Sequence, residues 1–505
     1  MNVLFRVDAT PGLGLGHLMR CVTLAERLRT DAHSVSFVGR YSDDAAAVMA
    51  RRGHRVVMLP DGALVPARLP SPEWRHPAQE NEAEETLHAL RDHGRFDWLA
   101  VDAYALDSAW ERPMRSIAER IMAIDDLANR AHDCDLLLDQ NFFLDPRQRY
   151  QGLVPRACRT LLGPKYALLG PEFRAARAAL GTRPGAIRRV LVSFGGHDVF
   201  GLTRKALAAI EGTGLHRLEV DVVTSPSNPD FSAIEQQCAK HERWRLHASP
   251  DMALLMVQAD LAIGAGGIMN WERACLRLPC VLVTVAENQT PIARDLAQDG
   301  RCVYLGSATE VSETQLSDAL RGLAATCTLV RALGERVGAL VDGDGAERVA
   351  HRLTSSTIEL RRATPSDSHH MYKWRNTAET RRYAFDPAPL EFERHVQWFG
   401  DALADPQIAL LIAEREDAAL GVVRYDLGAD TARVSVYLVP GRAGHGLGGE
   451  LIEAGTRWLR ARHPEIQRIV AEISPDNHAS LGAFANAGFV GHAHIYVRKL
   501  DDEAN

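Results

Sequence analysis

The sequence predicts an α/β protein in which two lobes, each built on a parallel sheet, precede a smaller α+β domain. Strand and helix signals alternate from the start of the chain to about residue 350, which is typical of parallel sheets covered by helices. The Pro- and Gly-bearing stretch "ALGTRPGAIR" divides this region into two series. After "HRLTSSTIEL", which reads as a linker, consecutive strands replace the alternation.

The strands expected in the two lobes are short and apolar. In the first lobe they span 3–7, 34–39, 55–59, 97–102, 120–125 and 136–141. In the second lobe they span 189–196, 219–224, 261–267, 280–285 and 302–306. Ligands of such sheets bind beyond the carboxyl ends of the strands, so we expect two Rossmann-like lobes, residues 1–155 and 156–350, with a ligand cleft between them.

The last part of the chain, residues 359–505, follows a different pattern. Strand signals at 408–414, 420–427 and 432–440 follow one another, as in an antiparallel sheet. A glycine-rich turn and the amphipathic helix "GELIEAGTRWLRAR" come next. This pattern predicts a separate α+β domain.

The composition narrows the function classes. A chain of 505 residues has room for two to four domains, and its net charge of −7 gives no polybasic face, so nucleic acid and anionic membrane are not expected partners. The 8 cysteines include no C-x-x-C pair, which argues against a zinc ribbon and fits a reducing compartment. No apolar run reaches about 18 residues. We therefore expect a cytoplasmic protein without a leader or a membrane span.

The stretch "VLFRVDATPGLGLGHLMRCVTLAERL" joins a strand, a glycine loop and a helix. Such a junction offers bare backbone N–H groups to a phosphate. The loop is not a Walker loop, because His17 and Leu18 follow Gly16 where Lys and Ser or Thr are needed. It is not a dinucleotide loop either, because its glycines are spaced by two. His17 stands where the helix begins and is the candidate for catalysis.

Two further glycine turns follow strands of the second lobe. They are "SFGGHD" and "GAGGIMNWE", and the polar run "ENQ" follows the next strand. Glu272 lies one turn into the helix after "GAGG", where a carboxylate can accept hydrogen bonds from the two vicinal hydroxyls of a ribose. An ordinary exposed helix residue is the alternative for Glu272.

Residues 1 to about 350 resemble the UDP-sugar hydrolases of pseudaminic acid biosynthesis. The resemblance rests, in order along the chain, on "FRVDATPGLGLGHLMRC", "DWLAVDAYALDSAWE", "IDDLANRAHDCDLLLDQNF", "LLGPKYALLGPEFRAAR", "VSFGGHD", "GAGGIMNWERACLRLPC" and "AENQ". It implies a GT-B-like pair of lobes. It also implies hydrolysis of UDP-2,4-diacetamido-2,4,6-trideoxy-β-L-altropyranose to UDP and the free sugar, by attack of water at the anomeric carbon.

The resemblance places the general base of the family on His17. Contacts to the UDP-sugar are expected from Gly14, Gly16, Arg20, Tyr104, Gly195, Gly196, Gly266, Gly267, Glu272, Glu287, Asn288 and Gln289. The chain departs from the family at Ile268 and Met269, where a small Ser-Thr pair is usual. Phosphate contacts at that loop are therefore expected from backbone N–H groups.

The position of His17 suits a base. The partial positive charge of a helix N-terminus favours the neutral imidazole, which can take a proton from water. UDP is a good leaving group once backbone donors offset its charge, so no metal is expected. The alternative is that His17 caps the helix or binds a phosphate.

Other polar and aromatic residues allow simpler explanations. The acidic residues and cysteine of "DDLANRAHDCD" suggest a metal cluster, but acidic residues at strand ends more often cap helices or fix loops, so metal binding at Asp125, Asp126, Asp133, Cys134 and Asp135 is not favoured. Tyr104 lines the sugar pocket or packs in its loop. His369 and His370 are expected to face solvent.

The last domain carries a second phosphate-binding pattern. "YLVPGRAGHGLGGELIEAGTRWL" places a glycine-rich turn between a strand and a helix, and "SPDNHASLGAFANAGF" follows. Residues 359 to about 500 resemble GNAT acetyltransferases, and "MYKWRN" and "HVQWF" resemble amino-sugar N-acetyltransferases of the same pathway. The resemblance implies acetyl-CoA as co-substrate, held by Gly444, Gly446, Gly448, Asn477 and Ser480.

Two departures from the GNAT pattern concern chemistry. The Arg or Gln that usually opens the coenzyme A loop falls at Ala443, one place after Arg442. The tyrosine that many members use as general acid is Phe484. A domain that binds without catalysing is therefore an alternative. Trp374, Arg375 and Asn376 are candidates for the acceptor site, although Trp374 and Trp398 suit a core equally well.

These inferences predict a fused enzyme of pseudaminic acid biosynthesis. Its last domain acetylates the 4-amino group of a UDP-amino-sugar, and its two lobes hydrolyse the product. One rival is a glycosyltransferase on the same two-lobed scaffold, although nothing in the sequence reads as a patch for a lipid acceptor. The other rival is a UDP-sugar-binding protein without catalysis, with an acyl-CoA-binding module.

Overall fold

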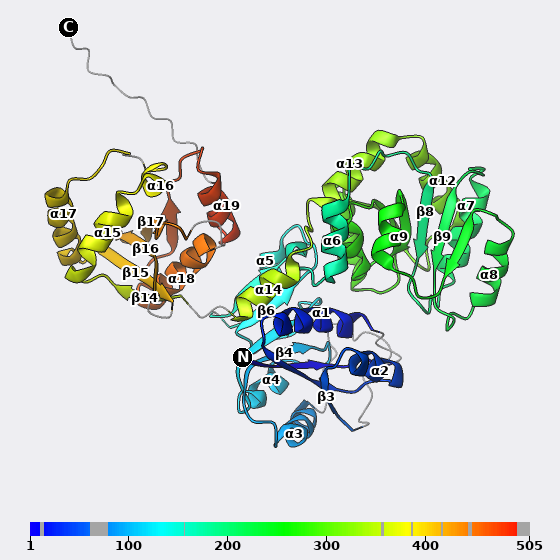
Figure 1. Ribbon diagram of the computed structural model, residues 1–505, viewed down its shortest axis with the longest axis horizontal. Helices are drawn as coiled ribbons and strands as arrows, with labels where there is room; N and C mark the ends of the chain where they lie inside the picture. The colour runs from blue at the N-terminus through cyan, green and yellow to red at the C-terminus, as the bar shows by residue number, and fades with distance from the viewer. Residues whose placement is uncertain are drawn as a thin grey trace, which may run out of the picture. The chain divides into compact units, whose positions relative to one another are not determined.

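The protein is described from a computed structural model. It covers residues 1–10, 15–60, 79–155, 157–354, 358–384, 387–415, 418–442 and 447–491. By its internal contacts the chain divides into two compact units, Met1–Thr354 and Ser355–Asn505. The first unit contains two sheets and the second contains one (Figure 1).

The first lobe is built on a seven-stranded sheet in which every neighbouring pair is parallel. In spatial order its strands are β3 (Arg55–Met58), β2 (Ser34–Gly39), β1 (Asn2–Val7), β4 (Phe96–Asp102), β5 (Ala118–Ile124), β6 (Leu136–Asp139) and β7 (Arg159–Leu162). Its helices are α1 (Gly16–Thr30), α2 (Asp43–Arg51), α3 (Gln79–Leu90), α4 (Ser108–Met114) and α5 (Pro146–Arg149). Since β1 lies between β2 and β4, residues after β1 and after β4 meet at one edge of the sheet.

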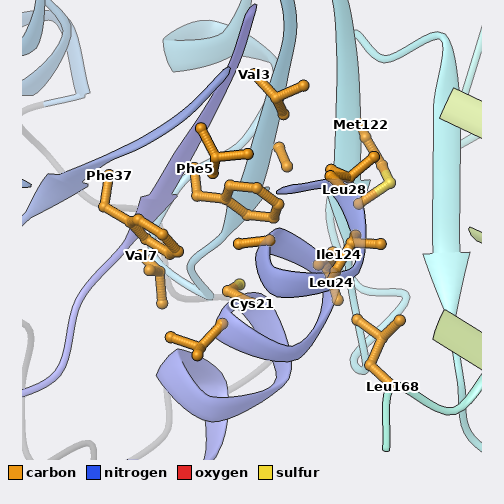
Figure 2. Close-up of a cluster of buried hydrophobic side chains, with 14 of the residues drawn as sticks. Val3, Phe5, Val7, Cys21, Leu24, Leu28, Phe37, Met122, Ile124 and Leu168 are labelled. Atoms are coloured by element: carbon orange, nitrogen blue, oxygen red, sulfur yellow. The ribbon is translucent and has the colours of Figure 1, made fainter. Parts of the chain in front are cut away.

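The core of this lobe fixes where α1 lies. Figure 2 shows the apolar side chains of α1 packed against those of the sheet. Within the sheet, the rings of Phe5 and Phe37 stack at a centroid distance of 5.1 Å. Cys21, Leu24 and Leu28 recur at helical spacing and are fully buried. Burial of each leucine side chain contributes about 1.5–3 kcal/mol, so α1 is held firmly against the sheet.

The second lobe repeats the plan with six parallel strands. In spatial order these are β10 (Trp244–His247), β9 (Glu219–Val223), β8 (Arg189–Ser193), β11 (Leu261–Ala265), β12 (Cys280–Thr284) and β13 (Val303–Ser307). Its helices are α7 (Leu202–Gly212), α8 (Phe231–Ala239), α9 (Met252–Gln258), α10 (Met269–Cys275), α11 (Gln289–Gln298), α12 (Glu313–Ala324) and α13 (Cys327–Gly338). The strand order reverses between β8 and β11, where the two glycine turns lie.

The boundaries expected between the lobes need correction. Strand β7 pairs with β6, so the first sheet continues beyond residue 155. Helix α6 (Pro171–Ala179) begins the connection to the second lobe, since Phe173 packs in a core of that lobe. Helix α14 (Gly345–Thr354) returns to the first lobe, where it lies beside α1 and its Leu353 joins the core (Figure 1). The expected linker also starts too early, because its first four residues belong to α14.

The second unit has a five-stranded mixed sheet of β14 (Glu359–Arg362), β15 (Ile408–Arg415), β16 (Ala418–Leu427), β17 (Thr431–Leu438) and β18 (Arg468–Ala471), in that order. The first three pairings are antiparallel and the last is parallel. Its helices are α15 (Ser368–Arg375), α16 (Ala378–Arg381), α17 (Phe392–Ala404), α18 (Leu447–Arg462) and α19 (His478–Asn486). Pairing between β17 and β18 ends at Val434, although β17 runs on to Leu438.

The fold class predicted from the sequence is confirmed: two Rossmann-like α/β lobes precede an α+β domain. Strands β7, β10, β14 and β18 were not expected, because each has four residues and mixes charged with apolar side chains. Among the described residues, no helix combines the length and the apolar composition needed to cross a bilayer.

Candidate functional site

His17 is the second residue of α1, directly after the glycine loop. Gly14 lies outside the described residues. Gly16 opens the helix, and a Cβ there would meet no atom of the described residues within 4 Å. The residue before the helix, Leu15, makes no side-chain capping bond, and the imidazole of His17 bonds elsewhere. Helix capping is therefore excluded as the role of His17.

Asp102, at the end of β4, holds the imidazole. Its Oδ1 lies 2.7 Å from Nδ1 of His17, and its side chain is fully buried while that of His17 is 18% exposed. The guanidinium of Arg20 lies 3.1 Å from the same nitrogen. Because an ionised carboxylate only accepts, the short contact to Asp102 requires a proton on Nδ1, and the guanidinium of Arg20 lies beside that nitrogen without donating to it. The neutral ring then carries its lone pair on Nε2, as a general base needs.

Arg20 lies beside both His17 and Asp102 and contacts each of them. It donates from Nε and Nη2 to the two oxygens of Asp102, both at 2.6 Å, and from Nη1 to Asp126 at 2.9 Å. Burial alone would raise the pKa of Asp102, but Arg20 and His17 outweigh it and hold that pKa well below its usual range. The donors of Arg20 are thus turned to two carboxylates and the residue is buried, while its expected contact with the UDP-sugar stays a prediction.

Tyr104 also faces inward. Its hydroxyl donates to Oδ2 of Asp126 at 2.8 Å, and its ring meets the imidazole of His17 edge-on, at a centroid distance of 4.6 Å. Burial, followed by the charge of Asp126, raises the pKa of Tyr104 well above its usual value. The phenol therefore stays a donor at neutral pH, and the ring restricts how the imidazole turns.

The acidic residues considered for metal binding are held by arginines instead. Asp125 pairs with Arg130 at 2.7 Å, and Asp133 and Asp135 both pair with Arg115 at 2.9 and 2.8 Å. Within the part of the chain that the structure describes, no three His, Cys, Asp or Glu side chains are grouped as metal ligands.

The glycine turns of the second lobe lie at neighbouring strand ends. Gly195 and Gly196 follow β8, and Gly266 and Gly267 follow β11. The φ of +115° at Gly267 is one that only glycine adopts without strain, and a Cβ on Gly266 would approach the side chain of Gln289 to 3.1 Å. The buried Arg273 braces this turn by donating to the carbonyl of Ala265 at 2.7 Å.

Glu272 lines an open cavity of about 380 Å³ in the second lobe. The other lining residues are Glu172, Phe173, Pro250, Asp251, Met252 and Ala253. Burial is the main cause that raises the pKa of Glu272 to about 7, and Glu172 adds to it. The cavity combines apolar walls with carboxylates, which suits a heterocycle attached to a sugar that bears hydroxyls.

The run from Glu287 to Gln289 opens α11. Glu287 is exposed, and Gln289 accepts a hydrogen bond from the backbone of Val285 at 3.0 Å, so its amide supports the turn. The side-chain oxygen of Asn288 is buried and has no hydrogen-bond partner among the described residues. A buried acceptor left without a partner costs about 1–3 kcal/mol, which a bound donor would recover.

In the second unit, part of the expected acetyl-CoA site lies outside the described residues, namely Ala443, Gly444 and Gly446. Gly448 lies in the first turn of α18, where a Cβ would meet Ala483 of α19 at 3.5 Å. Asn477 caps α19 by accepting from the backbone N–H of Ser480 at 3.1 Å. These two residues thus form a local helix start.

The acceptor candidates lie at the end of α15. Trp374 packs against the smaller core of this unit, as the alternative for it held. The amide of Asn376 donates to and accepts from the backbone of Leu390, at 3.0 and 2.8 Å, and so is turned to a loop of its own unit. Arg375 lies close enough to Tyr437 to oppose the increase that burial causes in the pKa of that phenol.

Phe484 is buried in α19 and meets Phe489 edge-on at 4.9 Å. It belongs to the apolar core of the unit. By contrast, Tyr437 lies on the end of β17 that continues past its pairing with β18. That end of the sheet therefore has a phenol, although position 484 has none.

Sequence reasoning missed Asp102, Asp139 and Asn141 as parts of the His17 site, and it considered Asp126 only as a metal ligand. The signal available was an acidic or amide residue at the end of each of three apolar strands, "DWLAVD", "RIMAIDD" and "LLLDQN". Since β4, β5 and β6 are neighbours, these ends lie side by side.

Comparisons with known proteins agree with this division of the chain. Residues 357–490 match the family model described as acetyltransferase (GNAT) domain. The spore coat polysaccharide biosynthesis protein SpsG of Bacillus subtilis is 33% identical over 189 residues, which are 37% of this chain and 56% of that protein. The match thus spans only about half the length of the Bacillus protein.

Two further relatives match a larger part of this chain than the Bacillus protein does. The UDP-2,4-diacetamido-2,4,6-trideoxy-beta-L-altropyranose hydrolase of Campylobacter jejuni is 26% identical over 306 residues, 59% of this chain and 97% of that enzyme. An uncharacterized protein of Methanocaldococcus jannaschii is 20% identical over 97% of this chain and 96% of its own length. The resemblances drawn from the sequence are confirmed: the chain joins a region similar to the Bacillus and Campylobacter proteins to a domain of the GNAT acetyltransferase family.

Proposed function

We propose that the two lobes hydrolyse UDP-2,4-diacetamido-2,4,6-trideoxy-β-L-altropyranose to UDP and the free sugar, and that the GNAT domain acetylates the 4-amino group of the precursor. The observation that carries the hydrolase assignment is the pairing of His17 with Asp102 at 2.7 Å, in the first turn of α1. The similarity to the Campylobacter hydrolase supports the choice of substrate.

In the proposed reaction a water molecule attacks the anomeric carbon. Its proton passes to Nε2 of His17 as the new carbon–oxygen bond forms. The bond from that carbon to the β-phosphate oxygen breaks, and UDP leaves with inversion at the carbon. Asp102 keeps the Nδ1 proton in place and stabilises the imidazolium, as an orienting carboxylate does in other acid–base pairs.

The second lobe holds the nucleotide in this proposal. Glu272 accepts from the ribose hydroxyls beside the 380 Å³ cavity, whose apolar walls take the uracil ring. Backbone N–H groups around Gly196 and Gly267 meet the pyrophosphate, and the unpaired oxygen of Asn288 accepts from a donor of the ligand. These contacts offset the charge of the leaving group without a metal ion.

Labelled water tests the hydrolase assignment. In H₂¹⁸O the heavy oxygen is expected in the free sugar and not in UDP, with no loss of rate in EDTA. His17→Ala is expected to lose about 10²–10⁴ in rate with unchanged UDP affinity, while His93→Ala, on an exposed turn, keeps both. Label in the nucleotide, or loss of UDP binding in place of rate, would contradict the proposed role of His17.

The rival functions give different outcomes in the same assay. A glycosyltransferase would release UDP only after an acceptor is added. A sensor would bind the UDP-sugar and release nothing.

For the GNAT domain we propose attack of the sugar amine on the thioester of acetyl-CoA, which forms the amide bond and releases the coenzyme A thiol. Arg375 and Trp374 are the proposed acceptor contacts. The expected result is consumption of acetyl-CoA with a UDP-4-amino-sugar and not with the same sugar already acetylated. Coenzyme A binding without turnover on any amino sugar would indicate a binding module.

A further inference from the structure

Asp126, at the end of β5, lies behind the His17–Asp102 pair and accepts three side-chain donors. Arg20 approaches Oδ2 at 2.9 Å, the hydroxyl of Tyr104 approaches the same oxygen at 2.8 Å, and the amide of Asn141 approaches Oδ1 at 2.8 Å. Both Arg20 and Tyr104 also contact His17. Asp126 is thus connected to the imidazole of His17 through Arg20 and, separately, through Tyr104.

The charge of Asp126 acts on Arg20. The guanidinium of Arg20 lies 3.1 Å from Nδ1 of His17, and a positive charge so near opposes the imidazolium that forms when His17 takes a proton. Asp102 shares its charge between His17 and Arg20, because Oδ1 accepts from both, at 2.7 and 2.6 Å. Because Asp126 also pairs with Arg20, Arg20 offsets less of the negative charge of Asp102. More of that charge then stabilises the imidazolium of His17.

Further polar groups of the described residues also contact this site. Arg149 donates to the backbone carbonyl of Asp126 at 3.1 Å, and Cys21 donates to Asp102 at 3.4 Å. Asn141 links Asp126 to Asp139, since its Nδ2 also donates to Asp139 at 2.9 Å. Burial, followed by the charge of Asp126, raises the pKa of Asp139 to about 7.

We propose that Asp126 is a positioning residue of the hydrolase, which neutralises Arg20 and holds Tyr104 so that His17 can accept a proton from water. This inference rests on the hydrolase function proposed above. It assigns Asp126 no contact with the substrate. Asn141 and Asp139 hold Asp126 from its other side, through neighbouring strand ends.

A double-mutant cycle tests the proposal on the full chain, with the UDP-diacetamido sugar as substrate. Asp126→Asn is expected to lower kcat about ten- to hundredfold with little change in KM, by analogy with outer-shell partners at other sites. In a His17→Asn background the same change is expected to lower the residual rate less than twofold, since Asp126 acts through His17. Additive losses would overturn the proposal.

The pH profile gives a second readout that a merely structural role would not move. With one negative charge removed, the acid limb of kcat/KM is expected to shift to lower pH in Asp126→Asn, because the imidazolium is then less favoured. A uniform loss of rate at every pH would overturn the proposal. Asp135→Asn is the matched control, since Asp135 pairs with Arg115 at the amino end of β6.

Further comparisons distinguish a failure of this inference from a failure of the proposed function and from misfolding. If His17→Asn alone retains the full rate, the hydrolase mechanism fails. If His17→Asn is inactive and Asp126→Asn is fully active, only the present inference fails. Asn141→Ala keeps the charge of Asp126 and removes one donor, so it is expected to leave the acid limb in place; a shift there would overturn the charge argument even if Asp126→Asn does not fold.

Discussion

Polar side chains have different structural roles in the first lobe and in the GNAT domain. In the first lobe a cluster at three strand ends is buried and hydrogen-bonded throughout, and His17 has its Nδ1 on Asp102. In the GNAT domain the polar candidates Asn376 and Asn477 are used for a loop and a helix start. The position of the usual acid is filled by Phe484, a core residue.

For the two activities proposed above, this difference implies different demands on the side chains. A base that must take a proton needs side chains fixed around it, which strand ends provide. Transfer from a thioester needs the two reactants brought together, which backbone and apolar surfaces can do. Mutations at polar side chains should therefore damage the hydrolase more than the acetyltransferase, and the following predictions test that contrast.

The largest effect is expected for Asp102→Asn. The amide can turn its NH₂ group to Nδ1 of His17 and so stabilise the wrong tautomer, which should lower kcat for hydrolysis by about 10³. Acetyl transfer by the same chain should be unchanged. Asp97→Asn, at the other end of β4, is the control and should keep both activities. A loss of less than tenfold would show that Asp102 does not set the tautomer.

Phe484→Ala is expected to act on stability instead of chemistry. Removal of a buried ring leaves a cavity and should cost the second unit about 3–5 kcal/mol, while the first unit and hydrolysis are unaffected. Denaturant unfolding with separate probes for the two units measures this. Phe484→Leu should cost clearly less. An equal loss in both units would contradict their independence.

His132 provides a pH test within the first lobe. Burial alone would lower the pKa of His132, but the nearby carboxylate of Asp125 and the hydrogen bond to Glu111 at 2.7 Å outweigh it and raise that pKa to about 9. Its contribution to stability is therefore complete below about pH 6.5 and lost as the pH rises through 9, on the order of 2–3 kcal/mol. Unfolding at pH 7 and pH 10 should show this loss in the wild type and not in His132→Gln. An identical pH slope in both proteins would exclude it.

The smallest effect is expected for Glu272→Gln. Hydrogen bonds to a charged group are worth about 1.5–3 kcal/mol, so loss of the charge should weaken UDP binding about tenfold. Because burial raises the pKa of Glu272 to about 7, stability falls as the pH rises from about 4.5 to 7. The variant should therefore be more stable than the wild type at pH 8 and equal to it near pH 4.5. Glu235→Gln, on the exposed face of α8 and away from the cavity, is the control.

The sequence was sufficient for the class of fold and for the position of His17 at the start of a helix. Period-two and period-3.6 patterns are local, and the glycine loop before α1 is a local signal as well. The sequence did not reveal the short strands β7 and β18, whose four residues carry too little pattern. It also did not reveal that Arg20 turns inward, because an arginine on a helix near a glycine loop suits a phosphate equally well.

By itself, the sequence determined the order of lobes and domain, the glycine loops at strand ends and the replacement of tyrosine by Phe484. Only the tertiary structure decided which carboxylate meets His17. Asp102 is 85 residues away, and it reaches the imidazole because β4 lies beside β1 in the sheet. Asp126 and Asn141 join the site in the same way, through β5 and β6. Side chains at the ends of adjacent parallel strands become neighbours through hydrogen bonds between strands, and those bonds form between segments far apart in the chain.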